Sequence, residues 1–142
     1  MRKLLKWGLA VCAVLLLTVL VLHNRSPWLS RIISRNTFGL ELWPLQKANL
    51  KIARYFDRKN GEVSFFLALG YSNAEKRNDI SYRYYKEAIT AKYPLTRVDV
   101  FMSLAASQGK CDEAVSTLQV TGYNPTEINE AYSKQCKKNG KA

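Results

Sequence analysis

Residues 111–136 read CDEAVSTLQVTGYNPTEINEAYSKQC, and this stretch decides the fold class. Within it, Asn124 and Pro125 are followed by Glu127, a pattern typical of a helix with an asparagine cap and a proline at its first position. The two acidic residues after Cys111 favour another helix start, because the N-terminal end of a helix carries partial positive charge. The stretch therefore predicts two consecutive helices joined by a short turn.

Cys111 and Cys136 lie at the start of the first predicted helix and at the end of the second. These two ends are side by side in an antiparallel hairpin, which brings the sulfurs within bridging distance. We therefore predict a Cys111–Cys136 disulfide, which would stabilise the fold by roughly 3.5 kcal/mol through loop closure. Two unrelated buried thiols are the alternative. A bridge would indicate an oxidising compartment.

The segments before this hairpin also carry apolar residues at helical spacing, and no segment alternates as a strand does. The expected fold class is therefore all-α, with about six or seven helices in antiparallel hairpins. In residues 44–56 the apolar stripe consists of Leu45, Ala48, Ile52, Tyr55 and Phe56. Pro44 and Asn60-Gly61 set the boundaries of residues 44–56, and Asp79 and Pro94 set those of residues 79–93. A capping box of Thr96 with Asp99, followed by Gly109, sets the boundaries of residues 96–107.

The N-terminal residues have the composition of a membrane anchor. No charged residue interrupts Trp7 to Leu22. Leu4 and Leu5 extend this run to about 18 residues, or roughly 27 Å as a helix. We expect residues 1–23 to form a transmembrane signal-anchor. A cleaved signal peptide and lipidation of Cys12 are the alternatives.

The charges around this run predict the orientation. Three basic side chains and the α-amino group precede it, and Arg25, Arg31 and Arg35 follow soon after. The positive-inside rule therefore favours a cytoplasmic N-terminus by a small margin, and the predicted disulfide agrees with it. The predicted localisation is the cytoplasmic (inner) membrane, as a single-pass protein whose C-terminal domain is periplasmic or extracytoplasmic.

Residues 24–43 are interpreted as a juxtamembrane amphipathic segment. Pro27 marks a helix start. Trp28 belongs to the apolar face of this helix, and Arg31 and Arg35 lie beside that face. This composition predicts that the three side chains lie at the membrane surface. Packing of the helix on the rest of the domain is the alternative.

The segment Val98–Pro125 resembles a tetratricopeptide repeat, and Phe65–Pro94 resembles a second one. In the first segment, Gly109 stands where such a repeat turns, and Ala114 and Leu118 stand where its second helix packs. The matching residues of the other segment are Leu69-Gly70-Tyr71, Tyr85, Ala88 and Pro94. The resemblance implies a scaffold of helical hairpins whose groove binds a peptide or a protein. We accordingly assign residues 44–138 to a tetratricopeptide-like domain and residues 139–142 to a basic tail.

The segment Tyr84–Leu118 is also similar to the extracytoplasmic helical tail of Wzy-class polymerases and O-oligosaccharyltransferases. The residues that carry this similarity are Tyr93-Pro94, Ala105-Ala106, Gly109 and Glu113-Ala114. It implies an accessory role in glycan assembly or protein glycosylation, because the chain lacks the many membrane spans that carry catalysis in that class.

The overall composition favours binding over catalysis. The chain has 22 Lys and Arg against 11 Asp and Glu, a formal net charge of +11, and a single His. This excess favours anionic partners. The sequence contains no Gly-rich phosphate loop, HExxH or GxSxG motif. We expect no enzyme, no cofactor and no metal site.

The candidate partner-binding residues are Tyr71, Arg83, Tyr84 and Lys86, because Tyr and Arg are over-represented among binding hot spots. Packing of the tyrosines in the core is the alternative. The predicted function is a membrane-anchored scaffold or adaptor of the bacterial envelope. Its expected partners are membrane lipid and an unidentified envelope protein, with no small-molecule substrate. Nucleic acid or another anionic polymer is a further alternative that the diffuse spread of basic residues disfavours.

Overall fold

The computed structural model describes Val14, Thr18 and residues 27–37 and 42–137. In this part of the chain there are seven α-helices and no strand, which confirms the all-α prediction. The helices are α2 (Pro27–Thr37), α3 (Trp43–Phe56), α4 (Gly61–Asn73), α5 (Asn78–Thr90), α6 (Val98–Ala106), α7 (Cys111–Thr121) and α8 (Pro125–Gln135).

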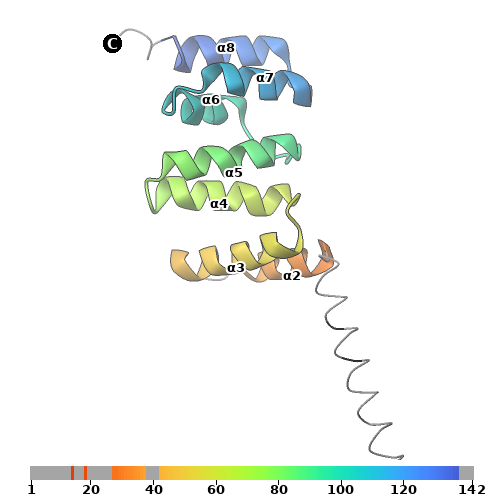
Figure 1. Ribbon diagram of the computed structural model, residues 1–142. Helices are drawn as coiled ribbons and strands as arrows, with labels where there is room; N and C mark the ends of the chain where they lie inside the picture. The colour runs from red at the N-terminus through yellow and green to blue at the C-terminus, as the bar shows by residue number, and fades with distance from the viewer. Residues whose placement is uncertain (1–13, 15–17, 19–26, 38–41, 138–142) are drawn as a thin grey trace, which may run out of the picture.

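The helices are stacked in chain order, from the α2–α3 layer at one end to α8 at the other (Figure 1). Helices α2 to α5 pack mainly on their neighbours along the chain: α2 on α3, α3 on α4, and α4 on α5. Further on, α5 contacts both α6 and α7, and α8 packs on both α6 and α7. Contacts between neighbouring elements are typical of folds that consist of repeated helical hairpins.

Two clusters of buried side chains hold the stack together. The first joins α4 to the C-terminal helices and contains Phe65, Ala68, Tyr82, Tyr85, Ala88, Ile89, Val98, Phe101, Met102, Leu104, Ala105, Ala114, Leu118, Ile128 and Ala131. The second joins α3 to α4 and contains Leu50, Ala53, Val63, Leu67 and Tyr71, with Ile33 of α2 packed against it. Since α4 contributes to both clusters, it is the central element of the stack.

The starts of two helices test the sequence signals. Asn124 caps α8 as predicted, because its side-chain oxygen accepts from Thr126 N at 2.9 Å. Asn60 caps α4, accepting from Glu62 N and Val63 N, and the preceding helix already ends at Phe56. The expectation that Asn60-Gly61 ends that helix is therefore corrected: the pair begins the next one.

The predicted capping box of Thr96 with Asp99 is wrong. Helix α6 begins at Val98, one residue too late for Thr96 to cap it, and no side-chain capping bond is made at Arg97. The Thr96 hydroxyl instead donates to the Tyr93 carbonyl at 2.6 Å. The amide of Arg97 donates to Tyr85 Oη at 2.8 Å, so a tyrosine of α5 satisfies the start of α6.

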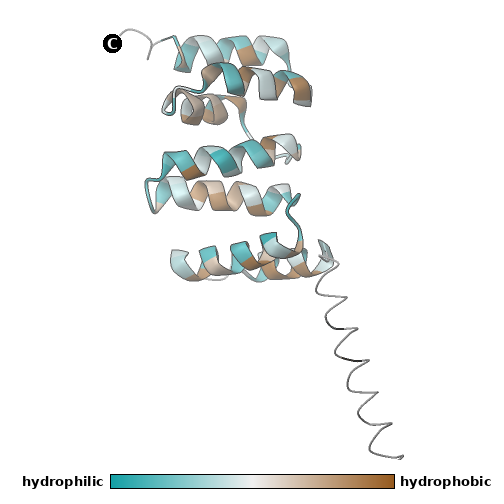
Figure 2. Cartoon of the chain, in the orientation of Figure 1, coloured by the Kyte–Doolittle hydropathy of each residue, from teal (hydrophilic) through white to brown (hydrophobic). Residues whose placement is uncertain are grey.

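Helices α2 and α3 bury less of their apolar surface than the sequence suggested. The buried residues of α2 are the small polar Ser30, Ser34 and Thr37. Ser30 Oγ accepts from Asn60 Nδ2 at 3.0 Å, which ties α2 to the start of α4. Hydrophobic residues are visible along both helices in Figure 2, and most of the apolar stripe that we identified in α3 is exposed.

The predicted single-pass localisation in the cytoplasmic membrane is corrected. Across residues 27–37 and 42–137, no helix has the length and apolar character that crossing a membrane requires. The segment on which the prediction rested, residues 1–23, lies outside the described residues except for Val14 and Thr18. The predicted basic tail at 139–142 lies outside them as well.

Cys111 and Cys136 form the predicted disulfide. Their Cα atoms are 6.2 Å apart, and the bridge joins the first residue of α7 to the residue that caps the C-terminus of α8. The turn between these helices contains Gly122 in the left-handed conformation, with φ of 82°. The bridge therefore closes the hairpin at the end opposite this turn.

The first prediction concerns this bridge. Cys111→Ser should lower the free energy of unfolding by about 3.5 kcal/mol, because it opens a loop of 25 residues in sequence separation. Cys136→Ser should cost the same, and the double variant should cost no more than either single one. Urea unfolding of the three variants measures this. Additive losses would mean that the two sulfurs act separately and would contradict the prediction.

A close helix contact generates the second prediction. A Cβ atom at Gly70 would lie 1.9 Å from Trp43 Cη2, so the α3 tryptophan packs directly on the α4 backbone. Alanine in place of glycine within a helix normally stabilises it by about 0.5–1 kcal/mol. Here we expect Gly70→Ala to destabilise the protein by about 1–3 kcal/mol through overpacking.

Thermal or urea unfolding gives the sign of this effect. Ser72→Ala, in the same helix, is the matched control and should be close to neutral. Adding Trp43→Phe to Gly70→Ala should recover part of the loss, because the smaller ring vacates the space that the new methyl group needs. A stabilised Gly70→Ala protein would show that Trp43 does not pack on this backbone.

Candidate functional site

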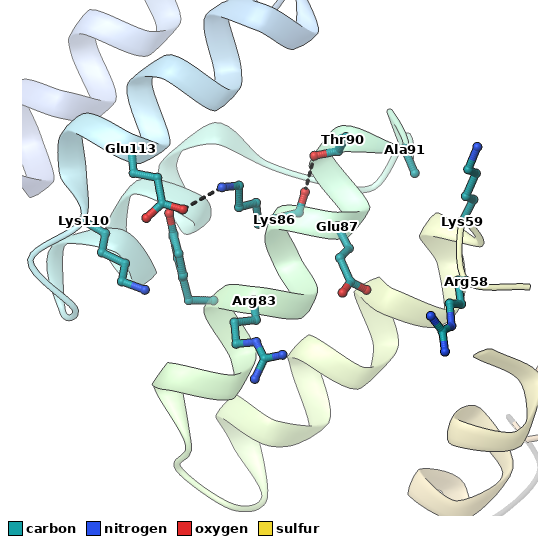
Figure 3. Close-up of a pocket in the computed structure, with 10 residues that line it drawn as sticks. Arg58, Lys59, Arg83, Lys86, Glu87, Thr90, Ala91, Lys110 and Glu113 are labelled. Atoms are coloured by element: carbon teal, nitrogen blue, oxygen red, sulfur yellow. Dashed lines mark hydrogen bonds and ion pairs between the residues drawn. The ribbon is translucent and has the colours of Figure 1, made fainter. Parts of the chain in front are cut away.

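An open pocket of about 740 Å³ lies along one side of α5 (Figure 3). Three separate parts of the chain form it: the turn before α4, helix α5 with its C-terminal cap, and the start of α7. The lining residues are Arg58, Lys59, Tyr82, Arg83, Lys86, Glu87, Thr90, Ala91, Lys110 and Glu113. Helices α4 and α6 contribute no lining residue to this pocket.

The pocket is strongly basic. Five of its lining residues are cations and two are carboxylates, an excess of three positive charges. Both carboxylates are already paired, Glu113 with Lys86 and Glu87 with Arg54. Within the described residues, no acidic side chain pairs with the other four cations, which are Arg58, Lys59, Arg83 and Lys110. An anionic group that enters the pocket therefore meets cations that are free to bind it.

The Glu87 carboxylate does not compete for the free cations of the pocket, because residues of two other helices bind it. Its carboxylate accepts from Arg54 Nη2 at 2.7 Å and from Arg54 Nε at 3.2 Å, a bidentate arrangement. Ser64 Oγ donates to the same carboxylate at 3.0 Å. These bonds tie α5 to α3 and α4, and they neutralise the acid closest to the centre of α5.

The Lys86–Glu113 pair joins α5 to α7 at 2.6 Å. The hydrogen bond from Lys86 lowers the pKa of the Glu113 carboxyl. Both side chains are more than one third exposed, so solvent screens the pair and its contribution to stability is small. Figure 3 shows the Lys86 and Glu113 side chains pointing toward each other, with Arg83 on the preceding turn of α5.

Tyr82 is the buried part of the pocket lining. The residue is 2% exposed and its ring stacks on Phe101 with centroids 5.3 Å apart. The Lys110 ammonium lies 5.2 Å from the centre of the ring. The Tyr82 hydroxyl is buried beside the Glu113 carboxylate and makes no hydrogen bond of standard geometry in the described part of the chain. Burial, followed by the nearby Glu113 carboxylate, raises the pKa of Tyr82 to about 12.

The four predicted partner-binding residues lie in different surroundings. Arg83 and Lys86 line the basic pocket, as described. Tyr71 is only 4% exposed and belongs to the α3–α4 core, where its ring stacks on that of Tyr84 at 5.6 Å. Tyr84 is half-buried, and the Arg54 guanidinium lies 5.2 Å from its ring. A smaller pocket of about 180 Å³ is lined by Arg54, Tyr71, Ile80, Arg83, Tyr84 and Glu87, so Arg83 and Glu87 belong to both pockets.

The three residues that we predicted to lie at a membrane surface belong to α2. Trp28, Arg31 and Arg35 are all exposed on this helix. Across residues 27–37 and 42–137, no three His, Cys, Asp or Glu side chains gather as a metal site would need.

Comparison with protein-family models, with curated proteins and with solved structures found no match for this chain.

Sequence reasoning missed Arg58, Lys59 and Lys110 as residues of the site. Each lies in a turn, more than twenty residues from Arg83 along the chain. The adjacent pair Arg58-Lys59 was the one local signal, since basic residues in a turn are free to point into solvent. Their convergence on α5 depends on how the three layers stack, which no local pattern encodes.

The third prediction uses the buried hydroxyl of Tyr82. Tyr82→Phe removes an unsatisfied polar group and should raise the free energy of unfolding by about 1 kcal/mol at pH 7. Because the folded-state pKa of Tyr82 lies above its ordinary value of 10.0, the folded protein keeps the phenol proton after the unfolded chain has lost it, and the wild-type free energy of unfolding falls as pH rises from 10 towards about 12. Tyr82→Phe should therefore lose less stability than the wild type as the pH rises above 10.

Urea unfolding of both proteins between pH 7 and pH 11 measures this. Tyr132→Phe, at a partly exposed position of α8, is the matched control and should follow the wild-type curve. A Tyr82→Phe protein less stable than wild type at pH 7 would mean that the hydroxyl has a partner in the folded state.

Proposed function

We propose that this chain is a protein–protein interaction scaffold, a tetratricopeptide-like stack of helical hairpins whose basic pocket along α5 binds an acidic segment of another protein. The observation that carries the proposal is the set of four unpaired cations, from two turns and one helix, around a pocket whose own carboxylates are already neutralised. Charge excess in a concave site focuses anionic partners and accelerates their association.

The arrangement of helices supports the tetratricopeptide-like interpretation. Consecutive helices pair through short turns, and the pairs follow one another along the stack. Gly109 has a φ of 65° in the turn before α7, where the repeat pattern expects its glycine. Ala114 and Leu118 are fully buried, at the positions where the second helix of a repeat packs.

An acidic peptide fits the pocket better than nucleic acid does. Single-stranded nucleic acid is held by exposed aromatic rings on which its bases stack, whereas the one aromatic ring of the pocket lining, Tyr82, is buried. Carboxylates need cations and hydrogen-bond donors, and the pocket offers both.

The fourth prediction tests this site with a defined probe, a fluorescein-labelled hexaglutamate peptide. Arg83→Glu should raise its dissociation constant by at least about tenfold, because it replaces an unpaired cation of the pocket with an anion. Binding to the wild-type chain should also weaken as salt rises from about 0.05 to 0.5 M. Fluorescence anisotropy measures both effects.

Lys134→Glu is the matched control, with the same charge change on an exposed position of α8 outside the pocket. It should leave peptide affinity almost unchanged. Thermal unfolding of Arg83→Glu should also be unchanged, since Arg83 is exposed and makes no ion pair with another described residue. Equal losses of peptide affinity in the two variants would mean that binding depends only on net charge, and would contradict a specific site.

The second candidate function, a binder of nucleic acid or another anionic polymer, is tested by measuring the binding of a single-stranded oligonucleotide of similar charge in the same anisotropy assay. Tighter binding of the oligonucleotide than of hexaglutamate, lost on Arg83→Glu, would favour a binder of anionic polymers. For natural partners, affinity capture with wild-type, Arg83→Glu and Lys134→Glu chains should retain a protein that only Arg83→Glu loses.

A further inference from the structure

The layer formed by α2 and α3 has an uncovered apolar face. Trp28 and Ile32 of α2 are 67% and 38% exposed, and Leu45, Ile52 and Tyr55 of α3 are 52%, 49% and 61% exposed. On α3 these residues lie on the side away from α4, and on α2 they lie on the side away from the buried Ser30, Ser34 and Thr37. Ile33 of α2 and Leu50 and Ala53 of α3 contact the shared α3–α4 cluster, so the exposed side chains point away from it.

The same two helices contain no acidic residue. Their 25 residues include five cations, Arg31, Arg35, Lys47, Lys51 and Arg54. Lys47 and Arg54 are used within the fold, where they pair with Glu75 of the α4–α5 turn and Glu87 of α5. Arg31, Arg35 and Lys51 are exposed and have no acidic partner in the part of the chain that the structure describes.

We propose that the outer face of the α2–α3 layer docks onto an anionic lipid surface, with Trp28, Ile32, Leu45, Ile52 and Tyr55 entering the headgroup region and Arg31, Arg35 and Lys51 contacting the anionic headgroups. Helices that lie in a membrane interface combine an apolar face with flanking Lys and Arg. Tryptophan and tyrosine are enriched at this depth because each has an apolar ring and a polar group. Such docking requires no membrane-spanning helix.

Charge decides between this occupant and the others. A second copy of the chain seated on the same face would bring two sets of unpaired cations together with no acidic residue to balance them. An anionic surface matches these charges and covers the apolar side chains at the same time. The proposal is independent of the basic pocket, because none of the pocket lining comes from α2 or α3.

Lysine footprinting of the full chain tests the proposal at the site itself. The chain is labelled with a water-soluble acetylating reagent, alone or with vesicles of phosphatidylcholine containing either no or 30 mol% phosphatidylglycerol (roughly a biological anionic fraction), and mass spectrometry reads each lysine. Lys51 should be labelled several-fold more slowly with the anionic vesicles than with the neutral ones. Lys134, which is exposed on α8, should be labelled equally in both.

Variants then separate the electrostatic and the apolar contributions to lipid binding. Arg31→Gln and Arg35→Gln should each lower the apparent affinity for anionic lipid, measured by the protection of Lys51, by about fivefold. This is the effect of one basic residue near an anionic surface. Trp28→Ser should also weaken it, and its fold is expected to be retained because Trp28 is exposed. Arg83→Glu, which disables the pocket, should leave the protection unchanged.

Two outcomes would overturn the proposal. Equal labelling of Lys51 with anionic and neutral vesicles would show that the face does not recognise anionic lipid. Protection of Lys51 that increases with protein concentration in the absence of vesicles would assign the face to a second copy of the chain.

Discussion

The contact of Trp43 with the backbone of Gly70 sets the distance between α3 and α4, and the rest of the α2–α3 layer depends on it. The indole ring occupies the space that any side chain at position 70 would need. Its Nε1 donates to Glu75 at 2.8 Å, and its ring makes an edge contact with Tyr71 at 5.8 Å. The ring is therefore fixed on three sides by α4 and the turn that follows it.

Around this contact, polar groups lock the layers in register. Lys47 donates to Glu75 at 2.7 Å, and its ammonium lies 4.8 Å from the ring of Tyr71. The bonds from Lys47 and then from Trp43 lower the pKa of the Glu75 carboxyl. Seven residues further along α3, which is about two turns, Arg54 binds Glu87 and lies over the ring of Tyr84. The tyrosines that were candidates for partner binding thus take part in joining α3 to α4 and α5.

The fold was largely predictable because its signals are local. Caps such as Asn124, prolines at first helical positions, and apolar spacing in α5 to α8 depend only on neighbouring residues. Ala114 and Leu118, which stand where the second helix of the predicted repeat packs, are fully buried. Prediction was weakest for α3, where spacing revealed an apolar stripe but not the direction that it faces. Leu50 and Ala53 pack against α4 instead, and Leu45, Ile52 and Tyr55 of the stripe are exposed.

The candidate site could be predicted only in part, for the same reason. Arg83 and Lys86 stand on the polar side of α5, and helical spacing alone identifies them. The basic character of the pocket depends instead on tertiary pairing: Arg54 of α3 neutralises Glu87, and Lys86 neutralises Glu113 of α7. Four cations are then left without acidic partners in the described residues. The packing that fixes α3 on α4 therefore also determines the charge of the pocket, since without Arg54 in place Glu87 would face an incoming carboxylate and repel it.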